Sequence, residues 1–161
     1  MSTSAPAAFE RVADGHASFT ESGKRDEPSW LSYVDDVEVA AQEGACYLDL
    51  GMSAEASAAL IRAISLLRTE APHRVRDHLH YIARLAKCHL LDGEVDHACH
   101  VATEGLTLAN SVGSARVFER LTEVSAALRP YGANAAVREF QQRFAATVAT
   151  RRGMTTREGP G

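Results

Sequence analysis

The chain has 161 residues and a mass of 17.3 kDa, and its 17 Lys and Arg against 21 Asp and Glu give a formal net charge of -4. This length predicts one domain with a core of its own, and the acidic balance disfavours direct nucleic-acid binding by this chain alone. Because no apolar run reaches the length of a membrane span or a secretory signal, we expect a cytoplasmic protein with no membrane partner.

The pattern along the chain predicts helices only. Alanine outnumbers valine and isoleucine together, and the prolines before position 150 fall between apolar-periodic segments. The expected helices span about 7–18, 30–50, 54–69, 75–91, 94–110, 115–129 and 133–149. A helical repeat domain at 7–149 is therefore predicted, with a polar linker at 19–28 inside it and disordered ends at 1–6 and 150–161.

A spacing of small residue, aromatic ring, glycine and alanine occurs twice, 42 residues apart. The two copies are Gly44, Tyr47, Gly51, Ala56 and Ala86, His89, Gly93, Ala98. In each copy the glycine suits a tight turn between two helices, and the small residues suit close packing of those helices. One hairpin cannot bury its own apolar face, so the pattern predicts antiparallel hairpins stacked as a short right-handed α-solenoid of about seven helices.

This pattern resembles the tetratricopeptide repeat, although its period is longer than that family's period of about 34 residues. Two further segments, Pro28–Asp36 and Arg76–His80, resemble the C-terminal repeat region of actinobacterial helix-turn-helix transcriptional regulators of the lambda-repressor class. The resemblance covers about 5–145 and implies a sensor or dimerisation region. A DNA-binding domain precedes the repeats in those proteins, and no pattern for one occurs in this chain.

Histidines and cysteines crowd the middle of the chain, so a metal site has to be weighed. His97 and Asp96 each share a helix face with His100, so either pair could present ligands to a metal. Cys88 and His89, however, are adjacent and point in different directions. Neither Cys88 nor Cys99 belongs to a Cys-x-x-Cys pair. With Cys46 the chain has three cysteines, and this odd number favours reduced, buried thiols over disulfides. We therefore expect no metal site, no cofactor and no catalytic residue, because no nucleophile or phosphate-binding motif appears either.

The candidate binding surface is the concave face, which helix A of each hairpin lines in tetratricopeptide-like proteins. The resemblance assigns to it, by position, Glu38 and Asp49, then His80, Lys87 and Leu91, then Phe118, Leu121, Ser125 and Arg129. The stripe runs from acidic to basic, which suits an extended peptide or a partner helix. Trp30 and Tyr33, three residues apart, are expected either to pack on the first helix or to form an aromatic edge for a partner or a homodimer.

These observations favour a non-enzymatic protein- or peptide-binding sensor module of a bacterial regulatory system, most simply a transcriptional one. Two alternatives stay open. One is a helical enzyme or metal-dependent protein that uses the His/Cys cluster, and the other is a DNA-binding regulator that acts with a separate DNA-binding domain.

Overall fold

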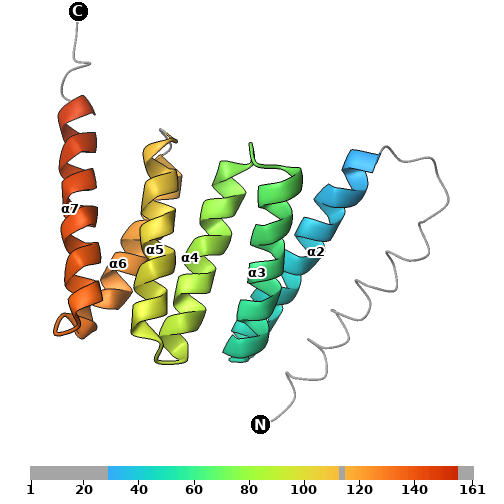
Figure 1. Cartoon of the computed structure of the whole chain (residues 1–161), viewed down its shortest axis with the longest axis horizontal. Helices are drawn as coiled ribbons and strands as arrows, with labels where there is room; N and C mark the ends of the chain where they lie inside the picture. The colour runs from blue at the N-terminus through green and yellow to red at the C-terminus, as the bar shows by residue number, and fades with distance from the viewer. Residues whose placement is uncertain (1–28, 113–114, 156–161) are drawn as a thin grey trace, which may run out of the picture. The chain divides into compact units, whose positions relative to one another are not determined.

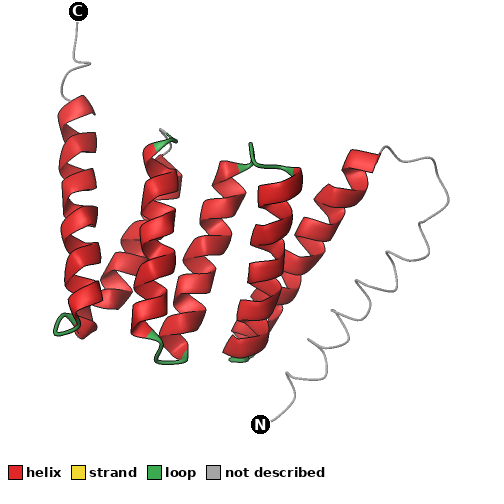
Figure 2. Ribbon diagram, viewed as in Figure 1, coloured by secondary structure: helices red, strands yellow, loops and turns green. Residues whose placement is uncertain are grey.

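The computed structural model describes residues 29–112 and 115–155, and within these ranges every regular element is helical (Figures 1 and 2). The all-α prediction is confirmed. The described residues form six α-helices and one short 3₁₀ helix, whereas seven helices were expected. The predicted helix at 7–18, the linker at 19–28 and the N-terminal end at 1–6 lie outside the described residues.

The observed helices follow the predicted ones closely. They are α2 (Ser29–Asp49), α3 (Ser53–Glu70), α4 (Val75–Leu91), α5 (Val95–Asn110), α6 (Ala115–Leu128), η1 (Arg129–Tyr131) and α7 (Ala135–Thr155). Most ends agree with the prediction to within two residues. The exception is α7, which continues into the segment that was expected to be disordered.

The chain divides into two compact units, Met1–Arg74 and Val75–Gly161, where the sequence predicted one domain. The division falls in the connection between α3 and α4, residues 71–74, which contains Pro72.

The first unit contains the α2–α3 hairpin, which is packed through small residues. A Cβ atom added to Gly44 would lie 2.8 Å from Cγ of Leu60, so the two helices approach more closely than any larger residue at position 44 would allow. On the surface Arg62 of α3 pairs with Glu43 of α2, and Arg74 donates to Glu38 at 2.8 Å. Apolar burial therefore holds this hairpin, and the ion pairs lie at its edge.

The second unit contains two stacked hairpins. α4 packs against α5 and α6, and α5 packs against α7, so the first helices of the two hairpins are neighbours and so are the second helices (Figure 1). Their shared core includes Leu79, Leu106, Leu121, Leu128 and Phe140, each less than 5% exposed. This is the stacking that the repeat pattern predicts. The right-handed course of a longer solenoid stays a prediction.

The two glycine turns have the same backbone structure, which confirms the 42-residue repeat at the atomic level. The N–H of Met52 donates to the carbonyl of Tyr47 at 2.9 Å, and the N–H of Glu94 donates to the carbonyl of His89 at 2.8 Å. The glycines between them have φ angles of +73° at Gly51 and +75° at Gly93. Each turn is a Schellman motif, in which a glycine in the left-handed region ends the helix.

Contacts near both ends of α7 fix it against α5, and the contact near its C-terminal end explains why the helix continues beyond residue 149. At its start the side chain of Asn134 accepts from the N–H of Ala136 at 2.8 Å and donates to Asp96 at 2.8 Å. Toward its end the Arg151 guanidinium donates to the carbonyl of Ala109, in the last turn of α5, at 3.2 Å. The disorder predicted at 150–161 is therefore wrong for residues 150–155, because Arg151 is a packing residue rather than part of a solvated tail. Residues 156–161 lie outside the described part.

Candidate functional site

A charged surface lies on α4 and α6, the first helices of the two hairpins in the second unit. On α4 it comprises Asp77, His80, Arg84 and Lys87, whose spacing of three and four residues places them on one face of the helix. On α6 it comprises Arg120 and Glu123, which form an ion pair at 3.5 Å. We call these six residues the α4–α6 charged face. His80 and Lys87 were predicted as binding residues, and the other four were not.

The environment of His80 shows that the charges of the two helices act together. Partial burial lowers the pKa of His80 below its ordinary value of 6.5, and the nearby Arg84 and Arg120 guanidinium groups lower it further. Asp77 and Glu123 oppose this effect but do not cancel it. Cations from both helices therefore dominate the field at His80.

A lowered pKa at His80 predicts a specific loss of stability in acid. When the pH falls through 6.5, the unfolded chain takes up a proton at this histidine before the folded chain does. The contribution of His80 to the free energy of unfolding is thus present above that pH and is lost as the pH falls through the folded pKa. The His80→Gln variant should lose less stability than the wild type between about pH 7.5 and pH 5 in urea titrations. Equal losses in the two proteins would contradict this assignment.

The same pKa can be followed directly. NMR titration of the wild-type His80 ring should give a pKa below 6.5, and the Arg84→Gln variant should have a higher His80 pKa than the wild type. An unchanged value in that variant would remove the electrostatic part of the explanation.

The predicted concave residues are only partly brought to an open surface. In the first unit Glu38 pairs with Arg74, and Asp49 is exposed. In the second unit Lys87 and Leu91 are exposed on α4, and Arg129 is exposed in η1. The structure thus keeps most of the predicted surface residues accessible.

The predicted register of α6 is wrong, because three of its assigned residues are used for packing. Leu121 and Ser125 are 1% and 3% exposed. The Phe118 ring stacks on Phe144 with centroids 5.2 Å apart, and the Arg151 guanidinium lies 4.8 Å from its centre. Arg120 and Glu123 are exposed charged residues of α6 in this region, so the third hairpin was aligned in the wrong register.

Trp30 and Tyr33 lie in the first turns of α2, but their side chains are outside the described part of the structure. The aromatic edge and the homodimer contact therefore stay predictions.

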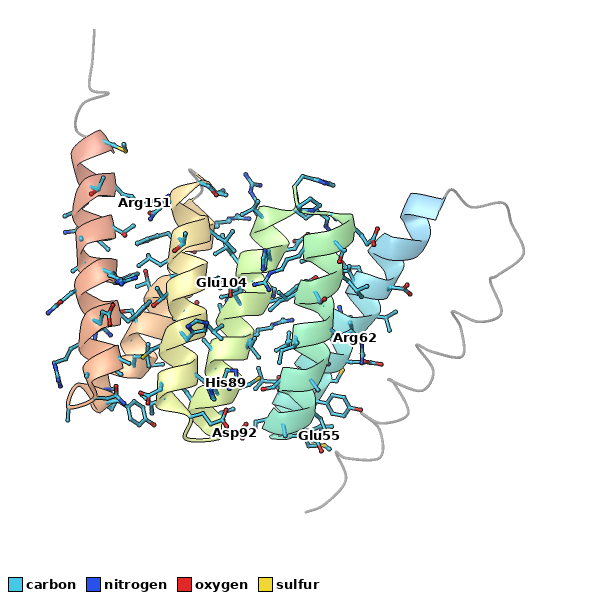
Figure 3. All side chains as sticks on the ribbon, viewed as in Figure 1. Glu55, Arg62, His89, Asp92, Glu104 and Arg151 are labelled. Atoms are coloured by element: carbon cyan, nitrogen blue, oxygen red, sulfur yellow. The ribbon has the colours of Figure 1, made fainter. Side chains whose placement is uncertain are left out.

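A second cluster lies at the turn between α4 and α5, where Figure 3 shows His89 near the end of α4. Nδ1 of His89 is 2.8 Å from Oε2 of Glu94, and Nδ1 of His97 is 3.5 Å from the same oxygen. The two imidazole rings have centroids 5.5 Å apart. Hydrogen bonding to His89, and to His97 as well, lowers the pKa of the Glu94 carboxyl, so this carboxylate is ionised at neutral pH. We call these three residues the His89–Glu94–His97 cluster.

The cluster differs from the pairs that helical spacing suggested. Asp96 accepts a hydrogen bond from Asn134, the residue just before α7, and so has a structural role. Cys88 and Cys99 are buried, and burial raises the pKa of the Cys99 thiol, which keeps it protonated. His97 meets His89 and Glu94 across the turn, which spacing along a single helix does not reveal.

No protein-family model, curated protein sequence or solved structure matches the chain. Among the helices that the structure describes, none combines the length and apolar character that crossing a membrane requires.

Proposed function

We propose that this chain is a non-enzymatic helical-repeat module that binds an extended acidic segment of a partner protein on the α4–α6 charged face. The observation that supports this most is that Arg84 of α4 and Arg120 of α6, two helices in contact, both act electrostatically on His80. A peptide that crosses both helices would meet both cations at once.

The composition of the face also favours a peptide over a small molecule. Its accessible residues are long and charged, and Lys87 extends the positive charge along α4. Guanidinium groups bind carboxylates through paired hydrogen bonds, so aspartate or glutamate side chains are the ligand groups that this face best accommodates.

A role in a bacterial regulatory system is the setting that we propose for this binding. The resemblance of the Pro28–Asp36 and Arg76–His80 segments to regulator repeat regions supports it. The net charge of -4 favours action through a protein partner over direct contact with DNA.

The proposal can be tested with a fluorescent peptide that alternates glutamate and alanine, by anisotropy with the full chain. We expect saturable binding that weakens as sodium chloride is raised, and a loss of roughly tenfold or more in the Arg84→Glu and Arg120→Glu variants. A peptide of the same length that alternates lysine and alanine should not bind.

Arg143→Glu is the matched control, because Arg143 is an exposed arginine of α7 outside the charged face and pairs with Glu139. This variant changes the net charge by the same amount and should keep most of the affinity. Equal losses in Arg143→Glu and Arg84→Glu would mean that only the overall charge matters, and the proposed site would then be wrong.

A further inference from the structure

The His89–Glu94–His97 cluster brings three good metal-binding groups to one point. One ligand atom from each residue lies within 4.8 Å of the other two. Side-chain exposure rises from 16% at His89 to 49% at Glu94 and 70% at His97, so one side of the cluster faces solvent. The cluster lies outside the charged face on which the proposed function rests.

The backbone of the turn creates this meeting point. In a Schellman motif the C-cap residue directly precedes the glycine. The side chain three positions before the C-cap residue lies beside the side chain two positions after it. In the turn after α4 these positions hold His89 and Glu94, and His97 follows Glu94 by three residues in the first turn of α5. All three ligands are therefore carried by backbone with a defined conformation.

The first repeat offers a comparison inside the same chain. Its turn has the same hydrogen bonds and the same positive glycine φ, but the equivalent positions hold Tyr47, Met52 and Glu55. Schellman motifs frequently have apolar side chains at the first two of these positions, and in the first repeat these are Tyr47 and Met52. The second repeat keeps the backbone and replaces the apolar pair by an imidazole and a carboxylate.

We propose that the cluster binds one Zn²⁺ ion through Nδ1 of His89, the Glu94 carboxylate and Nδ1 of His97. Two imidazoles and a carboxylate are ligands that zinc takes readily, and a water molecule from the exposed side completes a tetrahedral site. Zinc bonds of about 2.0–2.1 Å place neighbouring ligand atoms roughly 3.3 Å apart. The distances of 2.8 Å and 3.5 Å from Glu94 to the two histidines lie on either side of this value, and all three ligand atoms lie within 4.8 Å of one another.

The test is calorimetric titration of the full chain with zinc chloride at neutral pH. We expect one Zn²⁺ per chain, and a loss of affinity of roughly tenfold or more in the His97→Ala and Glu94→Gln variants. The His97 and Glu94 side chains are 70% and 49% exposed, so circular dichroism should show that both variants fold. His100→Ala, on an exposed histidine one turn further along α5, is the matched control and should bind as the wild type does.

Exchanging the residues of the two turns makes the test sharper. The combined variant His89→Tyr, Glu94→Met, His97→Glu gives the second turn the residues of the first and should not bind zinc. The reverse variant Tyr47→His, Met52→Glu, Glu55→His should bind two zinc ions per chain. Failure of the wild type to bind zinc below roughly millimolar concentrations, or binding that survives His97→Ala, would overturn the proposal.

Discussion

Replacing Phe140 by alanine is expected to lower the free energy of unfolding by about 3–5 kcal/mol. The Phe140 side chain is 1% exposed and belongs to the core that the two stacked hairpins share, and its ring lies 6.0 Å from that of Phe144. Alanine would leave a cavity there as well as removing the transfer free energy of the ring. Small domains have free energies of unfolding of about 5–15 kcal/mol, so this single substitution should remove a large part of the stability of the chain.

Urea denaturation followed by circular dichroism measures this effect as a lower midpoint at an unchanged slope. Leu91→Ala is the control, since Leu91 is 60% exposed and its truncation should change the free energy of unfolding by no more than about 0.5 kcal/mol. A loss below about 1 kcal/mol in Phe140→Ala would mean that α7 does not pack on this core as described.

Much of the fold can be read from the sequence because its signals are local. Apolar periodicity and the prolines located the helices, and Gly51 and Gly93 marked two turns that have the same hydrogen bonds. A glycine at the end of an apolar stripe is a strong signal, because few other residues tolerate the left-handed conformation that ends a helix.

The end of α7 and the register of α6 were missed because they depend on contacts between distant residues. Arg151 looks like a tail residue in the sequence, yet it donates to Ala109 and covers the Phe118 ring. Once Phe118 is packed in this way, Leu121 points into the core and Arg120 points outward. Local spacing along α6 does not distinguish these registers, because apolar and charged residues alternate closely along it.

The His89–Glu94–His97 cluster was missed for a different reason. Helical spacing paired His97 with His100, whereas the Schellman turn brings His97 to His89 and Glu94 instead. The signal was present in the repeat alignment, which matched His89 with Tyr47. The same alignment pairs Met52 with Glu94, so an apolar residue of the first copy is replaced by an acid in the second.

Replacing Gly93 by valine is expected to lower the free energy of unfolding by at least about 1–2 kcal/mol. Gly93 has a φ of +75°, where an L-residue places its Cβ too close to the following carbonyl oxygen. An added Cβ would meet no other atom within 4 Å, so the cost comes from backbone strain rather than from crowding. Gly51, with a φ of +73° and equally open surroundings, should show a similar cost when it is replaced by valine.

Two further substitutions separate this strain from a general effect of losing a glycine. Gly93→Asn should cost less than Gly93→Val, because asparagine enters the left-handed region more readily than a β-branched residue does. Gly153→Ala in α7 should be neutral or stabilising, since this glycine has an open surrounding and lies within a helix. Urea midpoints of all four variants measure the comparison. If Gly93→Val proved as stable as the wild type while Gly51→Val did not, the two turns would not share one backbone structure, and the repeat would not extend to the second turn.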